Sequence, residues 1–178
     1  MENSRSTYHK SILFIVILGA LTAIGPLSID MFLPGLPNIK NDFDTTASNA
    51  QLTISLFMVG LAFGNLFAGP ISDASGRKKP LLIAMIIFTL ASLGIIFVTN
   101  IWIMIALRLI QGLTGGAGAV ISRAIASDMY SGNDLTKFLS LLMLVNGVAP
   151  VIAPALGGVI LSFATWRMVF IILTVFGL

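Results

Sequence analysis

Long apolar stretches alternate with short polar breaks along the whole chain of 178 residues. Six of these stretches predict helices, at residues 11–33, 47–69, 80–98, 101–124, 138–161 and 166–178. The first five are about 19 to 24 residues long, which at 1.5 Å per residue is enough to cross roughly 30 Å of hydrocarbon. The sixth reaches only about 20 Å, so the chain is expected to break off inside that helix. We expect an all-α integral membrane fold in which residues 1–178 form a single transmembrane domain.

The composition excludes most soluble and catalytic alternatives. Hydrophobic residues make up 57% of the chain and charged residues 10%, whereas soluble domains average about 45–50% and 25%. The chain has no cysteine and one histidine, so it lacks the residues for a thiolate zinc site, a cysteine nucleophile or a cluster of histidine ligands. It also has no Ser-His-Asp set and no pair of catalytic acids. We therefore expect neither an enzyme nor a bound metal or cofactor.

The positive charges predict an orientation. If the N-terminus is cytoplasmic, the outer segments hold only Lys40 and Arg167, and the inner segments hold Arg5, Lys10, Arg77, Lys78, Lys79, Arg123 and Lys137. An inner excess of lysine and arginine is typical of multi-pass membrane proteins with this orientation. We interpret the net charge of +3 as this signal and expect no nucleic-acid partner.

Two ionisable side chains lie clearly inside the predicted spans, where a charge is costly, and not at the first or last two residues of a span. Asp30 is late in the first span and Arg108 is early in the fourth, so both are expected roughly 10 Å below the outer surface. Asp30 is either an acid at the interface or a buried carboxylate that takes up and releases a proton. Arg108 either reaches for the surface or faces the bundle interior as a fixed cation.

Small residues around these charges predict close helix packing. Gln111 follows Arg108 by one helical turn on the same face, and glycines and alanines continue from Gly112 to Ala119. The fifth span carries Pro150 and Pro154 and then Gly157 and Gly158. Two prolines remove two backbone donors, so we expect a kinked helix, either static or hinging.

A short polar loop joins the second and third spans. It contains Gly69, Asp73, Gly76, Arg77 and Lys78. Charges after a span usually only mark topology. Here an acid and an arginine lie four residues apart in a connection too short to be slack, which predicts a fixed ion pair. A loose echo of this loop follows Gly158, about 90 residues later, as expected for two three-helix repeats of opposite topology.

Four motifs together resemble one family of transporters. The loop matches G-x-x-x-D-x-x-G-R-[KR] at Gly69 to Lys78, and the fourth span matches R-x-x-Q-G at Arg108 to Gly112. The fifth span matches G-P-x-x-G-G at 153–158, with Ala153 in place of the first glycine, and residues 27–34 complete the set. In these motifs the chain resembles the major facilitator superfamily, in its twelve-helix drug/proton antiporter branch and the Bcr/CflA-like group. The chain departs from that pattern because helices seven to twelve are absent.

The resemblance implies the six-helix N-terminal half of such a fold, built as two inverted three-helix repeats with the sixth helix incomplete. It implies a carrier in the bacterial inner membrane that exports amphiphilic drugs in exchange for protons by alternating access, with the proton gradient as its energy source and no cofactor. Its partners would be the drug, protons, the lipid bilayer and the missing C-terminal half or an equivalent.

The resemblance also implies roles for particular residues. Asp30 would respond to protons with Arg108 as its coupled cation, and Gln111 and Asn146 would line or support the substrate cavity. The loop residues would form an inner gate, with Asp128 as a partner of Arg77. Pro150, Pro154, Gly157 and Gly158 would form the antiporter motif of the fifth helix.

Two other functions remain open at this point. One is a proton-linked permease for a small metabolite, which shares the same charged residues. The other is a fragment that does not transport, or an interaction half that needs a partner half.

Overall fold

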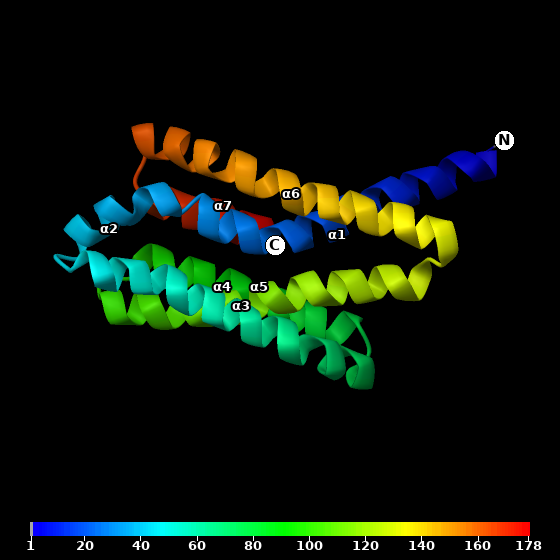
Figure 1. Cartoon of the computed structure of the whole chain (residues 1–178), viewed down its shortest axis with the longest axis horizontal. Helices are drawn as coiled ribbons and strands as arrows, with labels where there is room; N and C mark the ends of the chain where they lie inside the picture. The colour runs from blue at the N-terminus through cyan, green and yellow to red at the C-terminus, as the bar shows by residue number, and fades with distance from the viewer. Residues whose placement is uncertain (1) are drawn as a thin grey trace.

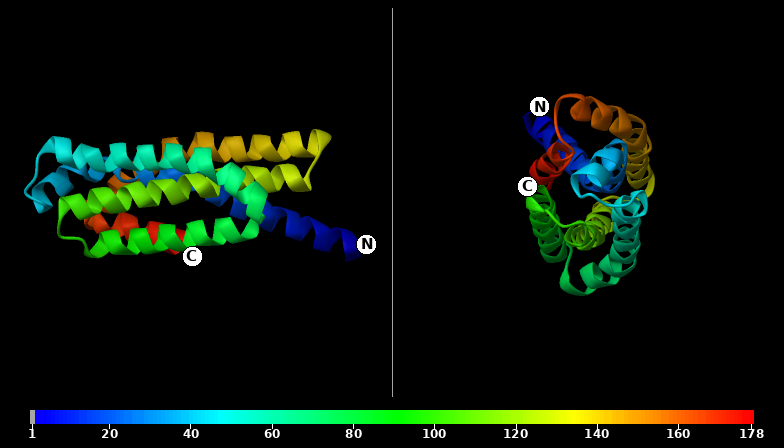
Figure 2. Two further views of the ribbon diagram at one scale, coloured as in Figure 1. Left: turned by 90° about the horizontal axis from the view of Figure 1, so that it is seen from below. Right: turned by 90° about the vertical axis from the view of Figure 1, so that its left-hand side faces the viewer.

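The protein is an elongated bundle of long helices that run close to one common axis (Figures 1 and 2). The computed structural model describes the backbone of residues 2–178 and the side chains of residues 14–178, so the side chains of Arg5 and Lys10 lie outside the described residues. The elements are α1 (Glu2–Asp30), the 3₁₀ turn η1 (Leu33–Gly35), α2 (Leu36–Asp42), α3 (Ala47–Ser75), α4 (Lys78–Phe97), α5 (Ile101–Met129), α6 (Gly132–Phe163) and α7 (Arg167–Gly177).

Most of these helices are long and apolar enough to cross a membrane. Within the described part of the chain there are five candidate spans: Phe14–Asp42, Ala47–Ser75, Lys78–Phe97, Ile101–Met129 and Gly132–Phe163. The helix α7 is apolar but has only 11 residues. The expected all-α fold is confirmed, and the chain is a multi-pass membrane protein.

Several helices extend beyond the ranges expected from hydropathy. The helix α3 continues past Gly69 and Pro70 to Ser75, α5 continues to Met129, and α6 begins at Gly132 rather than at residue 138. Hydropathy detects only the turns that lie in hydrocarbon, whereas the polar turns at the ends are helical as well. The helix α3 ends where Gly76 adopts a φ of +82°, which glycine adopts without a steric cost.

The end of the first span also differs from the expectation. The helix α1 begins at Glu2 and ends at Asp30, and the chain then turns through η1 into α2 instead of continuing to residue 33. Pro34 and Pro37 lie in the first turns of η1 and α2. Proline has no N–H to continue a helix but fits its first turn, so each proline begins a new element. Asp30 is therefore the last residue of α1.

The closest helix pair is α3 with α5. Glycines on both helices let the backbones touch: a Cβ added to Gly64 would overlap the Leu113 carbonyl, and one added to Gly112 would overlap the Phe57 carbonyl. Such contact is typical of membrane helices, where close packing replaces the hydrophobic effect. It fixes α5, and with it Arg108, against α3.

The other contacts agree with two inverted repeats. If α1, α3 and α4 form one repeat and α5, α6 and α7 the other, the pairing of α3 with α5 is equivalent to that of α6 with α1. Both pairings are present. The first helices of the two repeats, α1 and α5, also pack together, as do the third helices, α4 and α7. The helix α4 packs against α5 as well.

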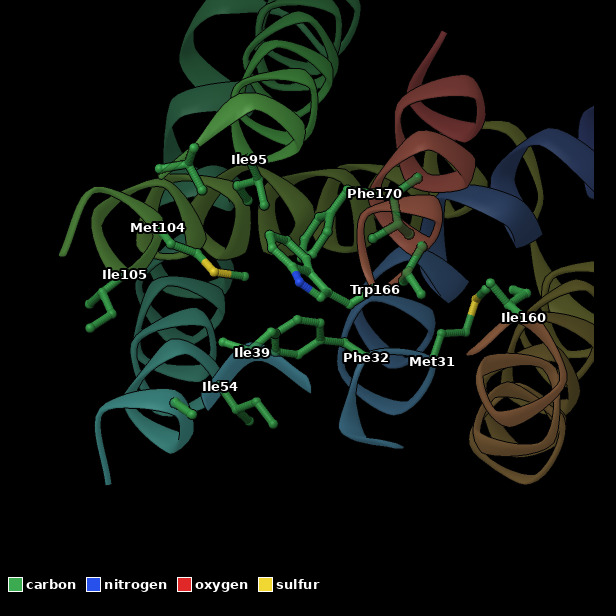
Figure 3. Packing of buried hydrophobic residues seen from close by; sticks show 14 of the residues in the cluster. Met31, Phe32, Ile39, Ile54, Ile95, Met104, Ile105, Ile160, Trp166 and Phe170 are labelled. Carbon is green, nitrogen blue, oxygen red and sulfur yellow. The ribbon is translucent and has the colours of Figure 1, made fainter. Parts of the chain in front are cut away.

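The main hydrophobic core lies where α1 ends and α7 begins. Phe32, Trp166 and Phe170 pack together there (Figure 3). The ring centroids of Phe32 and Phe170 are 5.3 Å apart, and those of Trp166 and Phe170 are 5.9 Å apart, both in edge-to-face geometry. This core forms one wall around Arg108.

Candidate functional site

Arg108 is fully buried (0% exposed) about two turns into α5. Its Nη1 donates to Oε1 of Gln111 at 2.9 Å, and its Nη2 donates to the backbone oxygen of Ser28 at 3.1 Å. The Nε2 of Gln111 donates in turn to the Ser92 hydroxyl at 2.7 Å. A single polar network therefore joins α5 to α1 and α4, and Arg108 is its centre.

Three aromatic rings surround the guanidinium group. Its carbon lies 4.4 Å from the ring centroid of Phe32, 4.6 Å from that of Phe57 and 5.5 Å from that of Phe170. Each is within the roughly 6 Å at which a ring face attracts a cation. We call Phe32, Phe57 and Phe170 the Arg108 cage. The sequence did not single them out, because phenylalanines in an apolar span are usual core residues.

Asp30 lies close in sequence to this network but does not pair with Arg108. It is half-buried at the end of α1, two residues after Ser28. Among the described side chains, no carboxylate lies within ion-pair distance of Arg108. Asp30 and Arg108 therefore form no ion pair in this structure, and the coupling implied by the resemblance stays a prediction. The Nε of Arg108 and the hydroxyl of Ser28 are both buried and find no hydrogen-bond partner in the described residues.

The two residues expected at a substrate cavity have different positions. Gln111 is fully buried within the polar network and supports Arg108. Asn146 donates to the backbone oxygen of Leu142 and lines a cavity of about 270 Å³ together with Arg123 on α5. Asn146 thus lines a cavity, whereas Gln111 lies inside the polar network. No group of three or more potential metal ligands occurs in the part of the chain that the structure describes.

The loop between α3 and α4 holds the second charged group. Arg77 donates through Nε to Oδ2 of Asp128 at 2.8 Å and through Nη1 to the Ser72 hydroxyl at 2.8 Å, and it also pairs with Asp73. The hydrogen bond to Asp128 is the largest influence on the pKa of Arg77 and raises it further. We call these four residues the Arg77 cluster. It ties the α3–α4 loop to the end of α5.

The remaining residues of this loop have supporting positions. Gly76 provides the turn with its positive φ, and Gly69 packs beside Val120 of α5. Lys78 begins α4 and is exposed. The predicted ion pair of Asp73 with Arg77 is therefore present, and Asp128 joins it from a helix distant in sequence.

Comparison of the sequence with known proteins identifies the family of the chain. The family model described as Major Facilitator Superfamily matches residues 16–178. The chain belongs to the Major Facilitator Superfamily.

Relatives within the superfamily include proteins named for drug resistance. The chain is 48% identical over 163 residues to "Uncharacterized MFS-type transporter YdgK" of Bacillus subtilis, covering 90% of this chain and 40% of that protein. It is 36% identical over 178 residues to "Bicyclomycin resistance protein homolog" of Haemophilus influenzae, covering 100% and 44%. It is 33% identical over 165 residues to "Multidrug resistance protein MdtL" of Citrobacter koseri, covering 93% and 42%. The chain spans about two fifths of the length of these curated relatives and matches their N-terminal part.

Gly157 of the G-P-x-x-G-G motif in α6 lies on the face toward the end of α1. A Cβ on Gly157 would overlap the backbone carbonyl of Met31, so this glycine permits close contact just after Asp30. Gly158 has open space around it, Pro154 is half-buried and Pro150 is exposed. The helix continues through both prolines without a break (Figure 1).

A further charged group lies at the opposite end of the bundle and was not predicted from the sequence. Oδ2 of Asp42 accepts from Nε1 of Trp166 at 2.7 Å and from Nη1 of Arg167 at 3.2 Å. Arg167 also donates to the backbone oxygen of Ile96 at 3.1 Å and stacks on Trp166 at 4.3 Å. We call Asp42, Trp166 and Arg167 the Arg167 cluster. It joins α2, α4 and α7.

The two clusters occupy equivalent places in the two repeats. Arg77 precedes the third helix of the first repeat, and Arg167 begins the third helix of the second. Each pairs with an acid near the end of the first helical segment of the other repeat, Asp128 and Asp42 respectively. In the sequence, this equivalence was indicated only by the weak similarity between the loop after Gly69 and the segment after Gly158.

Proposed function

We propose that this chain is the N-terminal part of a membrane transporter that exports drug-like molecules in exchange for protons by alternating access. The observation that carries the proposal is the pair of a caged cation, Arg108, and a nearby half-buried acid, Asp30, in an otherwise apolar bundle. The printed names of two relatives concern resistance to bicyclomycin and to multiple drugs. The similarity to these relatives favours a drug over a small metabolite as the transported substrate.

The coupling follows from electrostatics in a low-dielectric interior. Arg108 has a free Nε–H, and Asp30 follows the backbone group that already binds its Nη2. A charged Asp30 is attracted to the guanidinium, whereas a protonated Asp30 is not. Protonation would thus change how the end of α1 is held against α5. Drug binding that favours one arrangement would then release or take up a proton.

The Arg77 cluster suits a reversible latch in this cycle. Its ion pairs are partly exposed, with side-chain exposures of 24% for Arg77 and 52% for Asp128. Exposed pairs contribute little to stability because water screens them, so the latch can open at a small cost. We propose that it holds the α3–α4 loop against α5 in one state of the cycle and releases it in another.

The charge distribution supports placing the N-terminus in the cytoplasm of a bacterial cell, with the protein in the inner membrane. Among the described side chains, Arg77, Lys78, Lys79, Arg123 and Lys137 lie toward the end of the bundle that holds the Arg77 cluster. Lys40 and Arg167 lie at the other end. This asymmetry follows the positive-inside rule.

The proposal is tested by drug binding as a function of pH. If drug and proton compete, the affinity of the purified chain for a fluorescent amphiphilic drug rises with pH, because the carboxylate must lose its proton first. We expect Asp30→Asn to abolish this dependence, because an amide does not titrate. The measurement is fluorescence polarisation in detergent between pH 5 and 9, followed by proton-driven uptake in liposomes by the chain co-expressed with the C-terminal part of the Bacillus subtilis relative.

Asp44→Asn is the matched control, since Asp44 is an exposed acid in the loop before α3. It has a φ of +45°, a conformation that asparagine also adopts. This variant is expected to keep the pH dependence. An Asp30→Asn protein that keeps both the pH dependence and the proton-driven uptake would disprove the coupling role.

A further inference from the structure

A long groove opens between α3 and α4 on the outside of the bundle. Its volume is about 630 Å³, and α5 forms its floor. Both α3 and α4 pack on α5 but make few contacts with each other, which leaves the space between them open. Small side chains, Ala68 on α3, Ala84 on α4 and Ala117 on α5, deepen it.

The groove is apolar along its length and polar at one end. Ile71, Ile83, Ile87 and Leu113 are among the residues that line its walls. Ser75 and Lys79 line the end that lies next to the α3–α4 loop. Such a distribution provides room for a long apolar ligand with a charged group at one end.

The charged end carries free positive charge. Arg77 is paired with both Asp73 and Asp128, so these three residues together carry a net charge of −1, and Lys78 and Lys79 bring this end to +1. Lys78 and Lys79 are both exposed, and neither forms an ion pair with a described side chain. The mouth of the groove is therefore electrostatically complementary to an anion.

The wall formed by α4 has the composition of a lipid-facing surface. Its exposed side chains between Pro80 and Val98 are all hydrophobic: Leu82, Ile83, Ile86, Ile87, Leu90, Leu93 and Phe97. By contrast, α5 and α6 expose Arg123, Ser140 and Ser162. The groove therefore opens toward acyl chains, and its charged mouth is at the end of the span, where lipid headgroups lie.

We propose that this groove is a binding site for an anionic phospholipid. One acyl chain lies between α3 and α4 over Ala117, and the phosphate lies at Lys79 and Lys78. From Lys79 to Ile87 the helix rises about 12 Å, which accommodates an apolar tail, whereas a free phosphate would fill only the mouth. The site shares no residue with the Arg108 network, and its charged mouth adjoins the Arg77 cluster, since Lys78 and Lys79 directly follow Arg77.

The test measures lipid binding to the purified, delipidated chain by native mass spectrometry. The ligands are phosphatidylglycerol, phosphatidylcholine and glycerol phosphate. We expect one phosphatidylglycerol per chain, bound about fivefold more tightly than phosphatidylcholine for each lysine that its headgroup meets. Glycerol phosphate, which lacks acyl chains, is expected not to compete.

Two pairs of variants locate the site. Lys79→Gln is expected to weaken phosphatidylglycerol binding about fivefold and to leave phosphatidylcholine unchanged. Its control is Lys137→Gln, an exposed lysine toward the same end, on α6. Ala117→Phe fills the floor and is expected to weaken both lipids. Its control is Ala106→Phe, an exposed alanine on α5 outside the groove.

Three results would overturn the proposal. Equal effects of Lys79→Gln and Lys137→Gln would show a diffuse surface charge instead of a site. Competition by glycerol phosphate would show an anion site without a lipid tail. A dimer without bound lipid would show that a second copy of the chain covers the groove.

Discussion

The buried Arg108 illustrates how a membrane protein keeps a charge in its interior. Removing a cation from water costs several kcal/mol even after the surroundings relax. Among the described side chains no carboxylate offsets that cost directly, and the compensation comes from two hydrogen-bond acceptors and three aromatic rings. A charge held this way remains available to an approaching acid, which a preformed ion pair would not be.

The geometry of the Arg108 cage predicts that lysine cannot replace this arginine. An ammonium group lacks the planar fork that reaches both Gln111 and Ser28, so one acceptor loses its donor. We expect Arg108→Lys to reduce stability by about 1–3 kcal/mol. The measurement is the thermal unfolding midpoint of the purified chain in detergent.

Arg123→Lys is the control for that substitution. Arg123 is exposed on the same helix, so the change is expected to stay within about 0.5 kcal/mol. Equal midpoints for Arg108→Lys and the unaltered chain would show that the fork and the cage do not hold the arginine.

At the scale of residues, the sequence identifies charges better than their surroundings. Asp30 and Arg108 could be singled out because charges are rare and costly in apolar spans. Arg77 was indicated by its spacing from Asp73 in a short loop, and Asp128 only by the resemblance to the family. The cage could not be singled out, because Phe32, Phe57 and Phe170 come from three separate segments and meet only through tertiary packing. For the same reason the hydrogen bond from Arg108 to the Ser28 carbonyl could not be predicted, and the coupling of Asp30 with Arg108 stays a prediction.

At the scale of elements, hydropathy predicts the number of spans but not their ends. The apolar stretch of the sequence ends where the helix leaves the hydrocarbon layer. The helix itself continues through polar turns until a glycine or a loop ends it. Gly76 ends α3 in this way, beyond the end expected at residue 69. The short elements η1 and α2 were missed because they contain only three and seven residues.

The contact between α3 and α5 depends on the absence of side chains at particular glycines. We expect Gly64→Ala to force the two helices apart and to destabilise the chain by about 1–3 kcal/mol, as overpacking does. Gly147→Ala is the matched control in α6, since no atom lies within 4 Å of the added Cβ. It is expected to be neutral or slightly stabilising because alanine favours a helix over glycine. Thermal unfolding distinguishes the two, and equal midpoints would contradict the packing argument.

At the scale of the whole molecule, the two repeats give the bundle two charged ends of similar design. The Arg77 cluster joins the α3–α4 loop to α5 at one end, and the Arg167 cluster joins α2 to α7 at the other. Opposite topology of the repeats requires this placement on opposite sides of a membrane.

The orientation can be tested with cysteines, because the chain contains none of its own. Ala47 and Ala74 are exposed alanines at the two ends of α3, separated by about 40 Å along the helix, close to the full thickness of a bilayer with its headgroups. We expect a membrane-impermeant maleimide to label Ala47→Cys in intact cells and Ala74→Cys only after the membrane is opened.

Thr99→Cys and Ser131→Cys, at the two ends of α5, are expected to repeat that pattern, with Thr99 outside and Ser131 inside. Because α3 and α5 run in the same direction, both pairs must agree. Labelling of Ala74→Cys and Ser131→Cys in intact cells would place the Arg77 cluster outside and reverse the proposed orientation, whereas disagreement between the pairs would contradict the bundle itself.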